Sequence, residues 1–171
     1  MSSAITGIRR TCGTCRLCCL IFPLEGEFWT GGSKPARKWC EHSCAKGCAV
    51  HDQPRPAVCE NFTCDWLDHP ELPDEFRPDR IGIILTTLGL FEGQGVIQVS
   101  EHYSGKIDKA LSKLSVNAIF LVTYANEGFT RLRKLRGWAD GEKERFLIWL
   151  THNHKPLRNL NPNELKITEV R

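Results

Sequence analysis

The chain has 171 residues, of which 41% are hydrophobic, and its formal net charge is +3. This composition excludes a disordered chain, and the charge is too small to require nucleic acid or a membrane surface as a partner. All nine cysteines lie between Cys12 and Cys64, so the sequence divides into a cysteine-rich half and a cysteine-free half.

The sequence contains no obvious targeting or membrane-spanning segment. Its first ten residues, MSSAITGIRR, lack the apolar stretch of a secretory signal. The longest apolar runs, residues 81–91 and 117–125, are too short to cross a bilayer. We therefore expect a cytoplasmic protein without membrane contact. Thiols stay reduced in that compartment, where a cysteine cluster indicates metal binding or catalysis more often than disulfides.

Residues 1–68 form the predicted metal-binding region. Its segments 23–39 and 51–59 are rich in turn-forming residues and show no lasting hydrophobic periodicity. Such a region buries too few apolar side chains to order itself, and bound metal or disulfides are the usual remedy. Residues 69–80, HPELPDEFRPDR, are predicted to form an extended connector.

Residues 81–155 are predicted to form a small α+β unit that opens with a hairpin. Residues 80–91 are apolar and rich in β-branched side chains, and 95–103 alternate in the manner of a half-buried strand. The sequence Gly93-Gln94-Gly95 lies between them and indicates the turn.

The rest of this unit continues the alternation of helix and strand. Residues 104–115 carry a helical stripe of apolar residues, 117–125 resemble a buried strand, and 129–137 fit a strand or a short helix. Residues 140–154 begin with acidic side chains and predict a second helix, and 156–171 form an irregular tail. The predicted fold class is α+β, with a cysteine-rich, loop-rich, metal-stapled N-terminal half and a small C-terminal β-sheet with about two helices.

The cysteine spacing favours metal binding. A C-x-x-C loop lets two sulfurs converge on one ion, and structural zinc takes four Cys or His ligands. Adjacent side chains in extended backbone point to opposite faces, so Cys18 and Cys19 favour two sites, or one site with satellite thiols. The candidate metal ligands are Cys12, Cys15, Cys18, Cys19, Cys40, Cys44, Cys48, Cys59 and Cys64.

Other ligand chemistries remain open. The run C-x2-C-x2-C resembles the start of a ferredoxin motif, but Cys19 follows Cys18 directly and no Cys-Pro comes three residues later. Iron or an iron–sulfur cluster is therefore the alternative cofactor. The odd number of cysteines argues against a disulfide framework. His42 and His51 could be further ligands or ordinary solvated loop residues.

A family resemblance rests on three elements: CGTCRLCC at residues 12–19, Gly47-Cys48, and Arg-Pro-Ala-Val-Cys at 55–59. Together they resemble the CxxCxxCC family of zinc- or iron-chelating domain proteins, which includes the YkgJ-like group. The resemblance covers roughly residues 10–80. It implies metal binding and carries the family's cysteines onto Cys15, Cys18, Cys19, Cys48 and Cys59. It implies no particular reaction.

The sequence thus predicts a metal-binding protein, with zinc at two sites and a structural or interaction role toward a protein or macromolecular partner. The alternatives are an iron or iron–sulfur protein in electron transfer, sensing or redox chemistry, and a metal-handling protein. Nucleic-acid binding is disfavoured, because the basic run RLRKLR at 131–136 contains no aromatic residues for stacking. The sequence names no catalytic residue and no oligomeric state.

Overall fold

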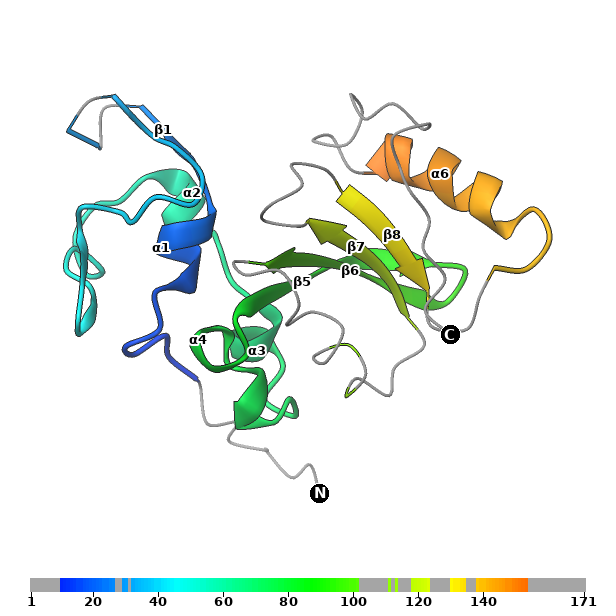
Figure 1. Ribbon diagram of the computed structural model, residues 1–171, viewed down its shortest axis with the longest axis horizontal. Coiled ribbons are helices and arrows are strands. Elements are labelled where there is room, and N and C mark those ends of the chain that lie inside the picture. The colour runs from blue at the N-terminus through cyan, green and yellow to red at the C-terminus, as the bar shows by residue number, and fades with distance from the viewer. Residues whose placement is uncertain are drawn as a thin grey trace, which may run out of the picture. The chain divides into compact units, whose positions relative to one another are not determined.

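The protein is described here by a computed structural model (Figure 1). The chain divides into two compact units, Met1–Ile84 and Leu85–Arg171. Helices, a small C-terminal sheet and a cysteine-rich N-terminal half are all present, so the predicted α+β class is confirmed. The structure describes residues 10–26, 29–30, 32–101, 111, 113, 118–123, 130–134 and 138–153.

The N-terminal unit is built from very short elements. Between Leu17 and Asp68 each described helix or strand is two to five residues long. Isolated helices and hairpins of this length are marginal in water. The elements are α1 (Leu17–Ile21), β1 (Leu24–Glu25) paired with β2 (Ser33–Lys34), β3 (Ser43–Cys44) paired with β4 (Gly47–Cys48), α2 (Ala57–Glu60) and α3 (Asp65–Asp68).

The apolar core of this unit is correspondingly small. Helix α1 buries Leu17, Leu20 and Ile21, and Cys40 and Cys64 are themselves buried. Further buried apolar side chains are Leu24, Trp66, Phe76, Ile83 and Ile84. Hydrophobic burial alone is thus a modest source of cohesion for this unit.

The segment predicted as an extended connector contains helical turns instead. A 3-10 turn, η1 (Asp74–Phe76), is followed by α4 (Pro78–Ile81). Pro78 occupies the first turn of α4, where its missing N–H is not needed, and Gly82 ends the helix with a φ of 78°. The prediction was wrong because Pro78 starts a helix here rather than preventing one.

The C-terminal sheet has four strands, β5 (Ile83–Phe91), β6 (Gln94–Glu101), β7 (Ala118–Thr123) and β8 (Thr130–Lys134), in the order β5-β6-β7-β8. Strands β6 and β7 are parallel, and β7 and β8 are antiparallel. A parallel pair needs a crossover connection, and the predicted helix 104–115 falls in it. Of residues 104–115 the structure describes only Leu111, which is helical and buried, and Lys113, which lies in a turn.

Strands β5 and β6 are joined by Glu92 and Gly93. Their φ angles are 46° and 77°, both positive, as a two-residue type I′ hairpin turn requires. The hairpin was predicted, but the turn was placed too late, because Gln94 and Gly95 already belong to β6. Segment 129–137 proves to contain a strand rather than a short helix.

Helix α6 (Glu142–Asn153) confirms the second predicted helix and packs on the sheet (Figure 1). Its Phe146 meets Phe91 of β5 edge to face, with ring centroids 5.2 Å apart. Gln94 Nε2 donates a hydrogen bond of 2.7 Å to the buried carboxylate of Glu142. The buried cluster is Phe91, Val96, Ile119, Phe146 and Leu150. The predicted tail, 156–171, lies outside the described residues.

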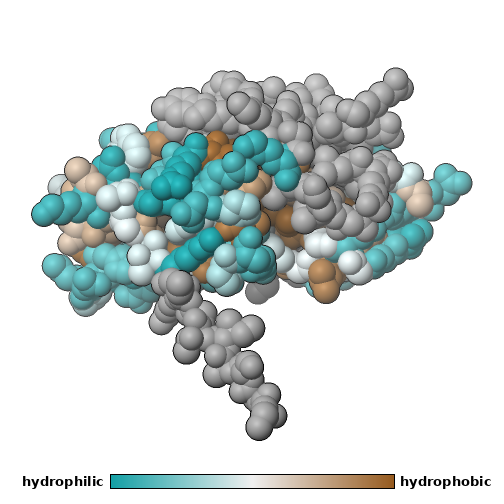
Figure 2. Space-filling view, turned by 90° about the horizontal axis from the view of Figure 1, so that it is seen from below, coloured by the Kyte–Doolittle hydropathy of each residue, from teal (hydrophilic) through white to brown (hydrophobic). Residues whose placement is uncertain are grey.

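Few large hydrophobic residues are exposed among the described residues. Figure 2 shows mainly hydrophilic and intermediate side chains among the coloured residues of that face. The exposed large hydrophobic residues, Trp39, Val58, Leu90 and Ile148, come from four different elements or loops. Within the described residues, no helix is long and apolar enough to span a membrane.

Candidate metal centre

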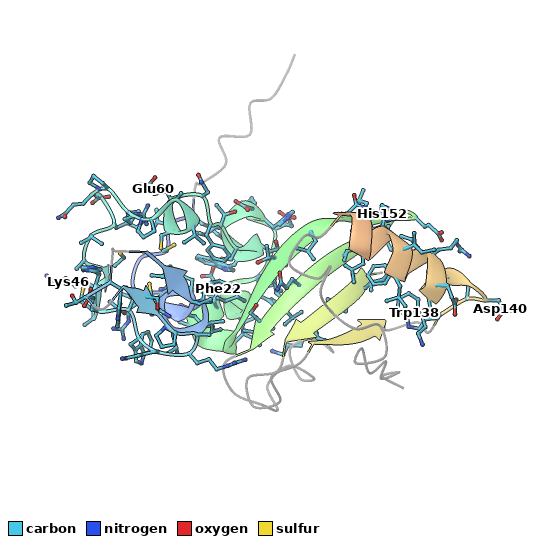
Figure 3. The ribbon with its side chains drawn as sticks, turned by 90° about the horizontal axis from the view of Figure 1, so that it is seen from above. Phe22, Lys46, Glu60, Trp138, Asp140 and His152 are labelled. Carbon is cyan, nitrogen blue, oxygen red and sulfur yellow. The ribbon has the colours of Figure 1, made fainter. Side chains whose placement is uncertain are left out.

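All nine cysteines belong to the N-terminal unit, and each is a free thiol. Cys40 and Cys64 are buried, and the other seven are partly exposed. Figure 3 shows sulfur atoms in this unit, in that view between the labelled Phe22 and Lys46. Disulfides therefore do not staple the unit, and every thiol is chemically available as a ligand.

The adjacent Cys18 and Cys19 lie in helix α1, not in extended backbone. Successive side chains of a helix do not point to opposite faces, so that premise of the sequence argument was wrong. The Cys18 thiol donates a hydrogen bond to the sulfur of Cys19, which lowers the pKa of Cys19 to about 7 and raises the pKa of Cys18. Cys12 lies near both sulfurs, because its charge acts on Cys18 and the charge of Cys19 acts on it.

Four thiols form what we call the first sulfur set: Cys12, Cys15, Cys18 and Cys64. Burial raises the pKa of Cys64, and the charges of Cys12 and Cys15 raise it further. A backbone turn brings Cys12 and Cys15 close together, because the N–H of Cys15 donates to the carbonyl of Cys12 at 2.9 Å. Such a turn brings the two ends of a C-x-x-C loop together.

Arginine and tryptophan side chains tie the loop of the first sulfur set to α3. Arg77 Nη2 donates to the carbonyl oxygen of Cys12 at 3.3 Å and to Thr14 Oγ1 at 2.9 Å. Its guanidinium lies 5.7 Å from the ring centroid of Trp66, two residues after Cys64. Arg10 lies 4.5 Å from the same ring and donates to the carbonyl of Trp66. Trp66 is therefore a buried packing element beside the sulfurs, whereas Trp39 is 48% exposed.

Four other thiols form the second sulfur set: Cys19, Cys40, Cys48 and Cys59. Burial raises the pKa values of Cys40 and Cys59, and so do the charges of Cys19 and Cys48. The N–H of Cys40 donates to the carbonyl of Cys19 at 3.1 Å, which joins the loop of Cys40 to α1.

The β3–β4 hairpin and α2 complete the surroundings of the second sulfur set. Cys48 in β4 pairs with Ser43 in β3, whose N–H donates to the carbonyl of Cys40 at 2.9 Å. Phe22, directly after α1, meets Phe62, just beyond α2, with centroids 5.0 Å apart. This aromatic contact holds the end of α2, and with it Cys59, near α1.

Gly47 permits the hairpin to approach the loop of the first sulfur set. Its φ is +119°, and a Cβ at this position would lie 2.5 Å from the carbonyl oxygen of Gly13. Only glycine fits a contact this close. Gly47 is thus a packing requirement that follows directly from the proximity of the two loops.

Cationic side chains surround the thiols. Arg55 lowers the pKa values of both Cys12 and Cys59, so its charge acts on a member of each set. Its buried Nε has no hydrogen-bond partner among the described residues. Lys34 is almost fully buried beside the second sulfur set. No pattern in the sequence marks Lys34 as buried, because a lysine in a turn-rich segment is ordinarily solvated.

Thiols are suitable ligands for a soft divalent ion, but these side chains are not arranged around a common point. Within the part of the chain that the structure describes, no group of three or more His, Cys, Asp or Glu side chains is arranged to hold a metal ion. Binding would therefore require the side chains of a set to rotate toward the ion. Raised pKa values keep most of these thiols protonated, and a cation favours the thiolate forms.

The remaining candidates lie apart from these groupings. Cys44 lies at the end of β3, where its backbone pairs with Gly47, and we assign it to neither sulfur set. His42 lies 3.6 Å from a carboxylate oxygen of Glu41, and His51 Nδ1 lies 3.1 Å from Asp52. Both histidines thus have a carboxylate neighbour, and the backbone N–H of His42 also hydrogen-bonds the sulfur of Cys40.

No family model, curated protein or solved structure matches the chain.

Proposed function

We propose that the N-terminal unit binds zinc through cysteine thiolates, with one ion in each sulfur set. Zinc prefers four Cys or His ligands, and each set offers four cysteines from loops that the backbone already brings together. The first set would use Cys12, Cys15, Cys18 and Cys64, and the second Cys19, Cys40, Cys48 and Cys59. The resemblance of residues 10–80 to the CxxCxxCC family agrees with this proposal.

The role we propose for zinc is structural. The observation that carries it is the combination of nine free thiols with elements of only two to five residues between Leu17 and Asp68. A unit of this kind lacks long helices and sheets, and structural zinc contributes folding free energy directly. The ordered unit would then present its loops to a protein or macromolecular partner.

Metal analysis tests the proposal. The full chain is purified anaerobically without a metal-affinity tag, and its metals are quantified together with its optical spectrum. We expect a colourless protein with about two zinc ions per chain, four thiolates for each. A protein without bound metal would contradict the proposal. A brown protein that contains iron would favour the iron–sulfur alternative, for which the first run of cysteines gives a partial match.

A further inference from the structure

Lys34 is the most unusual charged residue of the N-terminal unit. Only 1% of its surface is exposed, although it lies in the short strand β2 of a turn-rich segment. Its Nζ donates hydrogen bonds to the carbonyl oxygens of Leu20 at 3.4 Å and Pro35 at 3.1 Å, and to that of Phe22. Three acceptors match the three N–H donors of an ammonium group.

The charge of this ammonium has no carboxylate partner among the described residues. A buried charge is costly unless it is paired, and carbonyl oxygens supply only partial charge. Burial lowers the pKa of Lys34, and ionised Cys40, Cys19, Cys59 and, least, Cys18 oppose this shift. The first three of those thiols belong to the second sulfur set and only Cys18 belongs to the first, so the second set is the main anion that the lysine faces.

The hydrogen bonds also place Lys34 on the element that carries a ligand. Leu20 directly follows Cys19, and Phe22 directly follows α1. Lysine side chains commonly hydrogen-bond the last carbonyls of a helix in this way. The lysine thereby fixes the end of α1 while its charge lies beside the sulfurs. The first sulfur set has a further cationic neighbour, because Arg77 acts on Cys12 and Cys15.

We infer that Lys34 is the built-in counter-charge of a metal site formed by the second sulfur set, and that it positions α1 for ligation. Four thiolates around one divalent ion carry a net charge of −2, and a buried ammonium offsets part of it. This inference rests on the proposed function, because it requires metal in that set. Lys34 itself does not touch the metal.

The test compares zinc binding by the full chain in four forms: wild type, Lys34→Met, Lys34→Arg and Lys46→Met. Zinc is removed and returned anaerobically in competition with a chromophoric chelator, which gives the number of sites and the affinity of each. Lys46→Met is the matched control, because Lys46 is an exposed lysine of the β3–β4 turn, labelled at the edge of the unit in Figure 3.

We expect Lys34→Met to weaken one of the two zinc sites by about 10- to 100-fold, the usual cost of losing a supporting group near a metal. The zinc affinity of the other site in Lys34→Met should stay within about threefold of wild type. The affinities of both sites in Lys34→Arg and Lys46→Met should do the same, because neither variant removes the charge beside the second sulfur set. Cobalt(II) substitution provides a second readout, in which only one of two thiolate-to-cobalt absorption components should change in Lys34→Met.

Three results would overturn the inference. The first is wild-type affinity at both sites in Lys34→Met. The second is an equal loss at both sites in Lys34→Met and Lys34→Arg, which would indicate a role of shape alone. The third result applies if Lys34→Met does not fold, in which case Lys34→Arg decides. A loss of zinc affinity of tenfold or more at the second site in Lys34→Arg, despite the retained charge, would then overturn the inference. A wild-type chain that binds no metal would instead refute the proposed function.

Discussion

Each of the two units of this chain is stabilised internally by a different kind of interaction. In the C-terminal unit, strands of five to nine residues and a twelve-residue helix enclose an apolar cluster centred on Phe146, which is 0% exposed. In the N-terminal unit, short elements surround two sets of four thiols and a buried lysine. The C-terminal unit is stabilised by burial of apolar surface, and for the N-terminal unit we propose that a cation holds the thiolates together.

Metal removal should separate the two units most strongly. A chelator that binds zinc more tightly than the two sites do should unfold the N-terminal unit, because zinc binding contributes about 10–16 kcal/mol of apparent folding free energy in small domains. Hydrogen exchange measured by mass spectrometry should become fast in residues 10–68 and stay slow in β5, β6 and α6. Unchanged protection of residues 10–68 after complete metal removal would show that the thiols are not what orders them.

Replacement of one ligand should have the next largest effect. Cys19→Ser should reduce the zinc content from about two ions to one, because a serine hydroxyl is a much poorer ligand for zinc than a thiolate. Cys44→Ser is the matched control and should retain both ions, since Cys44 is assigned to neither sulfur set. Elemental analysis of the two variants makes the comparison, and equal loss in both would refute the assignment of ligands.

A cavity in the apolar cluster should affect only the C-terminal unit. Phe146→Ala removes a fully buried ring that contacts Phe91 and Trp138, and such truncations cost about 3–5 kcal/mol. Denaturant unfolding and hydrogen exchange of α6 measure this loss. Zinc content should not change. Loss of zinc in Phe146→Ala would mean that the N-terminal unit depends on the apolar cluster.

Two glycines with positive φ give the smallest expected effects and a direct contrast. Gly93→Ala should cost about 1 kcal/mol, because its φ is 77° but no atom lies near an added Cβ. Gly47→Ala should cost more, since the added Cβ would also meet the Gly13 carbonyl oxygen at 2.5 Å. Denaturant unfolding of zinc-loaded protein measures both, and an equal cost would show that the two loops do not need this close approach.

Much of the C-terminal fold could be predicted because its signals are local. Strands β5, β6 and β7 are rich in apolar and β-branched residues, and Glu142 and Glu144 mark the first turn of α6. The parallel pairing of β6 with β7 was not predicted, because it depends on contacts distant in sequence.

In the N-terminal unit the candidate ligand residues could be predicted from the sequence, but their arrangement in space could not. The cysteine spacing predicts ligands, yet α1 is only five residues long and has no side-chain cap, so nothing in the sequence marked Cys18 and Cys19 as helical. The grouping of Cys19 with Cys59 spans forty residues and follows from contacts such as that between Phe22 and Phe62. Lys34 was missed for the same reason, since its burial results from tertiary packing.

X-ray absorption at the zinc edge of the metal-loaded chain tests the central claim most directly, because it reports the atoms bonded to the ion. We predict a coordination shell of four sulfur atoms at about 2.3 Å, the Zn–S distance of thiolate sites. A shell dominated by nitrogen or oxygen at about 2.0–2.2 Å would contradict the claim that thiolates hold this unit together.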